Sequence, residues 1–369
     1  MTRLLLVGAG HAHAQVLRSW ARQPVPGVDL VLVSPGALAP YSGMVPGWLA
    51  GTYPFDTICI DVAALAAAAG ARLVAAELVA LDAAGRTATL DNGEVLAWDW
   101  LSVNTGSTLR PPDDLGVPVL ALRPLARLQT ACDAALATHA AGPAGQPLRL
   151  MAVGAGAAGF ESLLAAHARL RALRPDRPVQ ATLLSRGTAL LPGLAPGAVR
   201  AARRALQHIG AQLQLGKACT PAAAAGQHLL LWATGAQAHA WQQDAARHGG
   251  LAVDAGGFIQ VDAQLRSMSH PRVFAVGDCA AFTPPLAKAG VYAVRQGPVL
   301  TAQLRAAVAG TEAPAGYLPQ RQFLVLLATG DGRAIASRGR LWAEGRWVWH
   351  WKDRIDRGFL AGFDTGHRR

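Results

Sequence analysis

Short runs of apolar residues, each ended by small or polar residues, recur along this chain. The first run, Leu4 to Val7, has the continuous apolar character of a parallel strand buried on both faces. It stops at Gly8-Ala9-Gly10 and passes directly into residues 11–20, whose apolar positions have helical spacing. This pattern predicts a strand–turn–helix unit in which the glycines let the backbone approach a pyrophosphate at the helix N-terminus.

The same pattern occurs a second time. A strand predicted over Leu148 to Val153 is followed by a complete GxGxxG motif, residues 154–159, which opens a helix. The strand after each motif, 29–33 and 179–184, ends in Ser34-Pro35 and Ser185-Arg186 instead of the acidic residue that usually binds a ribose. Arg186 either reads a 2′-phosphate, which favours NADPH, or is an ordinary solvated loop residue.

The remaining pattern predicts an alternation of helices and strands. Asn-Gly between residues 87–90 and 95–98 favours a hairpin turn, and residues 40–47 form a turn-rich loop that covers a ligand or simply connects two elements. Further predicted elements are an alanine-rich helix at 61–69, strands at 72–78, 100–103, 229–233, 258–261 and 273–276, a helix starting within 284–297, a strand pair after 323, and a helix over 347–363.

Composition narrows the class of protein. No apolar run approaches the roughly 18 residues of a membrane span, and no signal peptide is recognised before the first strand. The four cysteines show no metal-ligand or dithiol spacing, which predicts no metal site and fits a reducing cytoplasm. The net charge of +11 reflects compositional bias or a surface that meets anions, and no nucleic-acid-binding module is recognised.

Taken in order, these motifs resemble the two-dinucleotide flavoproteins of the pyridine nucleotide–disulfide oxidoreductase superfamily. The segments LVGAGHAH, PYSGMVPG, VFAVGDCA and KAGVYAVRQGP resemble the oxidoreductase part often fused to selenide, water dikinase, and the tail GRWVWHWKDRIDRGFLAGF is similar to the C-terminal helix of type II NADH dehydrogenases. The resemblance implies an α/β fold with two Rossmann-like domains and a short C-terminal α+β tail. The expected segments are FAD domain 1–112 and 249–312, NAD(P)H domain 113–248, and tail 313–369.

The resemblance also implies roles for individual residues. Glu161 would orient the nicotinamide and Lys288 would lie at the acceptor side, which makes them the candidate catalytic residues. The FAD site would comprise Gly8, Ala9, Gly10, His11, Ser34, Pro35, Val79, Thr105, Gly106, Gly277, Asp278 and Ala289. The NAD(P)H site would comprise Gly154, Gly156, Gly159, Ser185, Arg186, Thr234 and Gly235.

Three departures from the family pattern change the expectations. His13 occupies the usual place of the third glycine, either as a capped surface residue or in contact with FAD. No redox dithiol follows the first motif, which disfavours reduction of a disulfide substrate. Ala287-Lys288 replaces the Ala-Gln pair of type II NADH dehydrogenases, which weakens the expectation of a quinone acceptor.

Helical spacing in the tail places aromatic and aliphatic residues on one face, namely Trp347, Val348, Trp351, Ile355 and Phe359. Charged residues, among them Lys352 and Asp356, are expected on the opposite face. Residues 333–369 hold nine Lys/Arg and four Asp/Glu, which suits a helix lying in a membrane interface. The alternatives are packing against the FAD domain, a homodimer contact, or a strand.

The sequence therefore predicts an FAD-dependent oxidoreductase that takes hydride from NADH or NADPH and passes electrons to a quinone-like or other small acceptor. A flavoprotein of selenium or sulfur metabolism with a chalcogen acceptor, and a flavin-bearing redox-sensing module with little turnover, are the alternatives. The expected location is cytoplasmic, with peripheral attachment to the inner face of the cytoplasmic membrane if the tail helix binds lipid.

Overall fold

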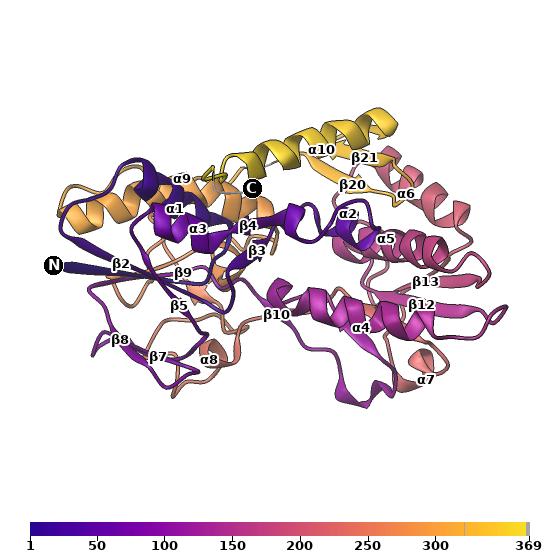
Figure 1. Ribbon diagram of the computed structural model, residues 1–369, viewed down its shortest axis with the longest axis horizontal. Coiled ribbons are helices and arrows are strands. Elements are labelled where there is room, and N and C mark those ends of the chain that lie inside the picture. Colours follow the sequence, from indigo (N-terminus) through magenta and orange to yellow (C-terminus); the bar gives the residue numbers. More distant parts are fainter. Residues whose placement is uncertain (321, 367–369) are drawn as a thin grey trace.

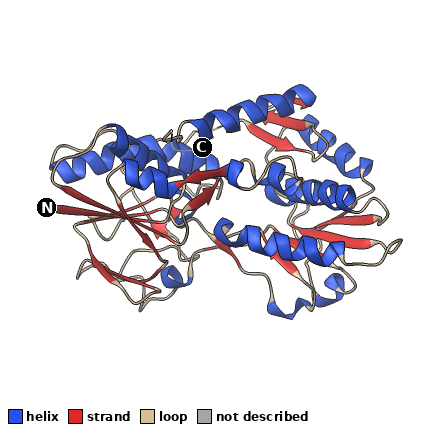
Figure 2. Ribbon diagram, in the orientation of Figure 1, coloured by secondary structure: helices blue, strands red, loops and turns tan. Residues whose placement is uncertain are grey.

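The computed structural model describes residues 1–320 and 322–366, which form two parallel sheets side by side with a helix along both (Figures 1 and 2). The first sheet contains, in spatial order, β18 (Val273–Ala275), β9 (Trp100–Val103), β1 (Thr2–Val7), β2 (Val28–Ser34) and β5 (Arg72–Ala75). β1 pairs with β2, the next strand in the chain, on one side and with β9 on the other. The strand order therefore reverses direction at β1, which creates a topological switch point at the C-terminal end of this strand.

Alternate residues of β1 face two different layers, which explains its uninterrupted apolar sequence. Leu4 and Leu6 pack with the helices α1 (His11–Arg22), α3 (Val62–Ala68) and α9 (Gly290–Ala309). Leu5 and Val7 pack with the antiparallel sheet of β6 (Leu78–Asp82), β7 (Thr87–Leu90) and β8 (Val95–Ala97). Burial on both faces is what a central parallel strand requires.

The second parallel sheet repeats this plan. Its strands, in spatial order, are β11 (Val119–Ala121), β15 (Leu229–Trp232), β12 (Leu148–Val153), β13 (Val179–Ser185) and β14 (Gln212–Leu215). Its helices are α4 (Leu128–Ala140), α5 (Ala157–Leu173), α6 (Pro196–His208) and α7 (Pro221–Ala224). The predicted fold class, with two Rossmann-like units, is confirmed.

The chain passes between the two sheets through a pair of short antiparallel strands, β10 (Thr108–Leu109) and β16 (Ala236–Gln237). After β16, helix α8 (Ala240–Gln243) packs back on the first sheet, where Trp241 joins its core and the Gln242 amide donates to the Cys279 carbonyl at 3.2 Å. Helix α8, which lies within the segment expected to form the NAD(P)H domain, therefore packs on the first sheet.

The tail forms a three-stranded antiparallel sheet and a helix: β20 (Val325–Ala328), β21 (Ala334–Arg338), β22 (Leu341–Gly345) and α10 (Arg346–Ala361). In Figure 1, α10 runs along one side of the molecule across both halves. None of the helices in the described ranges has the length and apolar composition to cross a bilayer.

Several smaller elements differ from the expectation. The strand predicted over 72–78 is two strands, β5 and β6, and α9 begins at Gly290 and continues through Pro298 to Ala309. The loop expected at 40–47 contains part of β3 (Leu38–Pro40) and of a short helix, α2 (Val45–Leu49). β3 pairs with β4 (Cys59–Asp61), and β17 (Ile259–Gln260) pairs with β19 (Ala280–Ala281).

Candidate functional site

The first glycine turn is closed around Asn104, which follows β9. Gly8 has φ +88°, and a Cβ there would lie 2.6 Å from the Asn104 carbonyl oxygen, while a Cβ on Gly10 would lie 2.3 Å from the Asn104 side chain. Asn104 Oδ1 accepts hydrogen bonds from the backbone N–H of Ala12 at 3.1 Å and of His13 at 3.3 Å. Asn104 therefore caps α1, and both glycines are needed so that the two loops can touch.

His13 is a buried structural residue, not a surface one. Its Nδ1 lies 2.6 Å from the Gly8 carbonyl oxygen and its Nε2 lies 2.8 Å from Ser102 Oγ. Burial lowers the pKa of His13 to about 4, so the ring is neutral at physiological pH. The ring thus ties the glycine turn to β9 at the place where a third glycine is usual, and the surface alternative is wrong.

The expected FAD residues gather at the C-terminal edge of the first sheet. Thr105 and Gly106 follow β9, Gly277 and Asp278 follow β18, and Ala289 precedes α9. A Cβ at Gly106 would meet no atom within 4 Å, so Gly106 borders open space. Thr105 Oγ1 is buried without a hydrogen-bond partner among the described residues, which leaves a polar group able to meet a ligand at this edge.

Other expected FAD residues lie nearby with local partners. The Ser34 hydroxyl donates to the Gly36 carbonyl at 3.1 Å, and Pro35 follows it at the end of β2. Val79 is half-buried in β6. The His11 ring lies edge-on to Tyr41 at 5.2 Å and to Phe359 at 6.0 Å between ring centroids, so α10 reaches the glycine turn.

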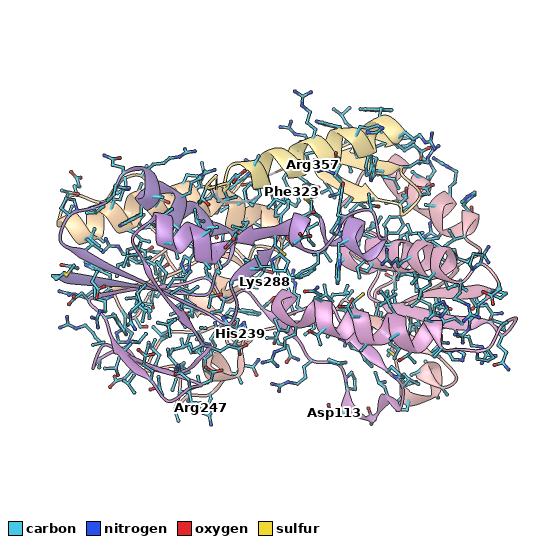
Figure 3. All side chains as sticks on the ribbon, viewed as in Figure 1. Asp113, His239, Arg247, Lys288, Phe323 and Arg357 are labelled. Atoms are coloured by element: carbon cyan, nitrogen blue, oxygen red, sulfur yellow. The ribbon has the colours of Figure 1, made fainter. Side chains whose placement is uncertain are left out.

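Asp278 and Lys288 lie at the junction between the two parallel sheets. The Asp278 carboxylate pairs with Arg123, which follows β11, at 2.6 Å. Lys288 Nζ donates to the Ala280 carbonyl at 2.7 Å and lies 3.6 Å from the centre of the Phe258 ring, and burial lowers its pKa. Figure 3 shows Lys288 and His239 near the middle of the molecule, and His239 Nε2 lies 3.1 Å from the Thr105 carbonyl oxygen.

In the second glycine motif the middle glycine borders open space, and the third makes a tight helix contact. A Cβ at Gly156 would meet no atom within 4 Å, whereas a Cβ at Gly159 would lie 1.9 Å from the Gly154 carbonyl oxygen. Close helix–strand packing therefore requires the third glycine, as the motif predicts. Thr234 and Gly235 follow β15 at the same edge, and beyond β13 the Ser185 hydroxyl accepts from the Gly187 N–H at 3.1 Å while Arg186 is exposed.

Glu161 lies in α5 under the tail sheet. Its Oε1 accepts a hydrogen bond from the Ala328 backbone N–H at 2.7 Å, and the residue is 9% exposed. The pKa of Glu161 is raised to about 7, mainly by burial; Lys352 and the Ala328 N–H act to lower it, and Asp356 makes a smaller contribution that raises it. Glu161 therefore exchanges a proton near neutral pH.

A buried polar cluster that the sequence analysis missed connects this region with the first glycine turn. Lys352 and Asp356 form an ion pair at 2.6 Å, with side chains 10% and 9% exposed. Lys352 Nζ also donates to the Gly43 carbonyl, and the Tyr41 hydroxyl donates to Asp356, which with burial raises the pKa of Tyr41. The expectation that Lys352 and Asp356 face solvent is wrong, because Tyr41 and Gly43 supply partners from a distant part of the chain.

The apolar face expected on α10 is divided between two environments. Val348 is fully buried against β21, but Trp347, Trp351 and Ile355 are 59%, 40% and 42% exposed. The rings of Trp347 and Trp351 stack with centroids 6.3 Å apart. The helix therefore turns a charged pair inward and an aromatic stripe outward.

Sequence comparison identifies the family. A family model for the pyridine nucleotide-disulphide oxidoreductases matches residues 2–297, most of the chain, and the protein belongs to this family. The match confirms the predicted class, an FAD-dependent NAD(P)H oxidoreductase. No curated protein matches the sequence at a significant level.

Solved structures share the fold at low sequence identity. The sulfide:quinone oxidoreductase of Aquifex aeolicus is 15% identical with a TM-score of 0.78, covering 99% of this chain and 92% of its own. NDH2 of Plasmodium falciparum is 10% identical with a TM-score of 0.73, covering 98% and 97%. A NAD-dependent persulfide reductase from A. fulgidus is 16% identical with a TM-score of 0.70, covering 91% and 64%.

Proposed function

We propose that this protein oxidises NAD(P)H and reduces a small quinone-like acceptor at a membrane surface. The observation that carries the acceptor proposal is the orientation of α10, whose outward stripe of Trp347, Trp351 and Ile355 is exposed. Leu341 and Trp342 of β22 are 76% and 41% exposed, and several arginines of the tail are exposed with them. Exposed aromatic residues flanked by arginines suit the interface of an anionic leaflet.

The residues at the two sheet edges fit the cofactors of the family. Gly8, Gly10 and the start of α1 would hold the FAD pyrophosphate, Thr105 and Asp278 would meet the flavin nucleotide, and residues 154–159 would hold NAD(P)H. Bound FAD supplies the hydride-accepting and electron-carrying chemistry. The protein would hold the two cofactors at the two sheet edges and would exclude water from the region between them.

Glu161 has a second role in this proposal beside the one implied by the resemblance. Reduction of a quinone consumes protons, and a carboxyl group whose pKa is raised to about 7 can hold one while Oε1 accepts from the Ala328 N–H. Glu161 lies in the same buried region as Lys352 and Asp356, both of which affect its pKa, and Asp356 in turn binds Tyr41. We infer that this cluster holds protons close to where the acceptor is reduced.

A chalcogen acceptor has less support. The Cys279 thiol is buried and donates to the carbonyls of Val276 at 3.1 Å and Val103 at 3.3 Å, and burial raises its pKa. None of the four cysteines is in a disulfide. A buried thiol with a raised pKa is a poor nucleophile.

The experiment for turnover is anaerobic addition of NADH or NADPH to the purified flavoprotein, followed by an acceptor screen. We expect flavin bleaching, and reoxidation by a short-chain quinone faster than by sulfide-derived acceptors. If Arg186 reads a 2′-phosphate, Arg186→Ala lowers kcat/KM for NADPH much more than for NADH. Bleaching without reoxidation by any quinone would contradict the acceptor proposal.

The experiment for the membrane is sedimentation with anionic vesicles. Trp347→Ser combined with Trp351→Ser should weaken vesicle binding by about tenfold or more, because each ring loses apolar burial in the interface. Met268→Ala, which changes an apolar side chain 64% exposed elsewhere, is the matched control. A wild-type protein that stays in the supernatant at low salt would refute membrane attachment.

A further inference from the structure

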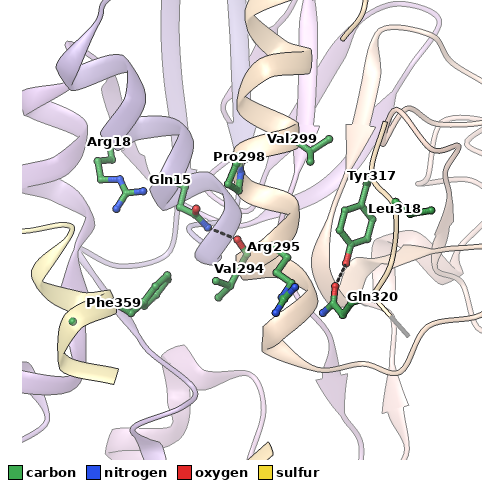
Figure 4. Close-up of a pocket in the computed structure, with 11 residues that line it drawn as sticks. Gln15, Arg18, Val294, Arg295, Pro298, Val299, Tyr317, Leu318, Gln320 and Phe359 are labelled. Carbon is green, nitrogen blue, oxygen red and sulfur yellow. Dashed lines mark hydrogen bonds between the residues drawn. The ribbon is translucent and has the colours of Figure 1, made fainter. Parts of the chain in front are cut away.

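A cleft of about 670 Å³ lies between α1, α9, residues 317–320 and the end of α10 (Figure 4). Its lining contains two arginines, Arg18 from α1 and Arg295 from α9, together with Gln15 and Gln320. None of the residues expected to bind FAD or NAD(P)H lines it. The cleft is therefore separate from the proposed cofactor sites.

The cleft is positively charged and its lining has no acidic residue. Within the described residues, neither Arg18 nor Arg295 forms an ion pair. Among the residues that the structure describes, Arg18 contacts the Gly362 carbonyl, at 3.5 Å, and the face of the Phe363 ring, at 4.9 Å. Burial and the nearby charge of Arg22 lower the pKa of Arg18, as expected for a cation that lacks a counterion.

An unpaired hydrogen-bond donor adds to this charge. The Tyr317 hydroxyl donates to Gln320 Oε1 at 3.2 Å, which fixes the orientation of the Gln320 amide. Gln320 Nε2 is buried and finds no acceptor among the described residues. Figure 4 shows this nitrogen on the side of the amide that faces Arg295. Figure 4 also shows Arg18 at the opposite end of the cleft from Arg295. The Arg295 guanidinium and the Gln320 amide N–H favour an anion with several oxygen acceptors, such as a phosphate, and Arg18 adds positive charge at the other end.

The other walls of the cleft are apolar. Phe359 lines it, and Leu318 stands at its edge with 89% of its surface exposed. Gly358, also in the lining, follows Trp347, Trp351 and Ile355 at helical spacing on the outward face of α10. The exposed apolar stripe of α10 therefore leads to the cleft, which indicates a ligand with an anionic head and an apolar tail.

We propose that this cleft binds the phosphate head group of an anionic phospholipid, with Arg295 and the Gln320 amide on the phosphate, Arg18 adding positive charge at the other end, and the acyl chains along the α10 stripe. The proposal rests on the membrane attachment proposed above and adds a specific lipid site to it. A saturable site would fix the position of α10 on the bilayer, whereas the aromatic stripe alone would allow it to slide.

The first test uses a soluble short-chain phosphatidylglycerol below its micelle concentration, titrated into the FAD-loaded protein and followed by calorimetry. We expect saturable binding that Arg18→Gln with Arg295→Gln weakens about tenfold or more, since Arg295 contacts the anion and Arg18 adds positive charge to the cleft. Arg338→Gln with Arg340→Gln removes the same charge from the exposed tail, outside the cleft lining, and should leave this binding unchanged. The single variant Arg295→Gln changes an exposed residue, so it should fold normally, and it should also weaken binding.

The outcomes separate this proposal from membrane attachment. If the short-chain lipid binds at the cleft but the protein does not sediment with vesicles, membrane attachment is refuted and the lipid site in the cleft still stands. Vesicle binding that the cleft variants do not change, without saturable binding of the short-chain lipid, would overturn the cleft proposal and leave attachment intact. Inorganic phosphate that binds as tightly as the lipid, or a soluble quinone that displaces it, would also overturn the assignment to a phospholipid.

Discussion

At the residue scale, single side chains from distant segments decide the local chemistry. Asn104 caps a helix that begins almost a hundred residues earlier, and Asp278 is held by Arg123 from the other half of the protein. Glu161 is buried under a strand of the tail. Each of these groups has properties that its neighbours in sequence do not predict.

Asp278→Asn should weaken FAD binding by about tenfold or more. In the proposed site Asp278 is the charged acceptor for the ribityl hydroxyls, and a hydrogen bond to a charged group is worth about 1.5–3 kcal/mol. Flavin content after purification and titration of the apoprotein with FAD measure the effect. Asp113→Asn, at an exposed position, is the control, and full flavin retention with unchanged affinity in Asp278→Asn would contradict the assignment.

Glu161 should make stability depend on pH. Its pKa is about 7 in the folded protein and near 4.5 when unfolded, so the folded state binds the extra proton. Stability is therefore fully present below about pH 4.5 and falls as the pH rises through about 7, by on the order of 3 kcal/mol.

Denaturant unfolding of wild type and Glu161→Gln across this pH range checks the expectation. The amide resembles the protonated acid and does not titrate, so the variant should lose this part of the pH dependence. The same slope in both proteins would show that Glu161 is not the titrating group.

At the element scale, α10 is amphipathic in an unusual sense. Its inward face carries Val348, Lys352 and Asp356, and its outward face carries Trp347 and Trp351. A buried ion pair is tolerated because each charge has a further partner, the Gly43 carbonyl for Lys352 and the Tyr41 hydroxyl for Asp356. The inward face of α10 therefore packs on the fold through a buried ion pair, while its aromatic side chains remain exposed.

Breaking the pair on one side should be costly. Lys352→Met leaves the Asp356 charge buried without its cation and should lower the free energy of unfolding by about 3–5 kcal/mol. The double variant with Asp356→Leu should recover much of that loss. Arg357→Gln, which removes the exposed partner of the pair with Asp353, is the control and should cost about 1 kcal/mol or less. Equal losses in Lys352→Met and Arg357→Gln would contradict the burial.

At the scale of the whole molecule, two parallel sheets place their C-terminal edges toward a shared junction, and α10 spans both halves (Figure 1). Tyr53 of the first domain donates to Asp353 of α10 at 2.5 Å, while Val348 packs on the tail sheet. The tail therefore connects segments that the two glycine motifs alone would leave independent.

Removing residues 346–369 should destabilise the fold as well as abolish vesicle binding. Burial of Val348 and Phe363 is lost, and one such side chain contributes about 1.5–3 kcal/mol. The unfolding midpoint of the truncated and full-length proteins measures the effect. An unchanged midpoint would show that α10 does not support the remaining structure.

Much of the fold is determined by local sequence. Apolar runs such as Leu4 to Val7 form strands because both faces are covered, and Gly8 and Gly154 mark the turns because positive φ angles there exclude most side chains. These features repeat in the family's order, so the class of protein follows from them. The helix in the tail is also evident from its spacing.

Other features depend on contacts between distant segments, and only the tertiary structure decided them. His13 is buried because the Gly8 carbonyl accepts from Nδ1 of its neutral ring and the Ser102 hydroxyl donates to Nε2. Lys352 turns inward because the Gly43 carbonyl and Asp356 bind its ammonium group. Helical periodicity assigns charged residues to solvent, since burial of a charge is unfavourable without partners. Those partners come from other elements, so the orientation of α10, and with it the exposed stripe and the cleft, could not be derived from the sequence.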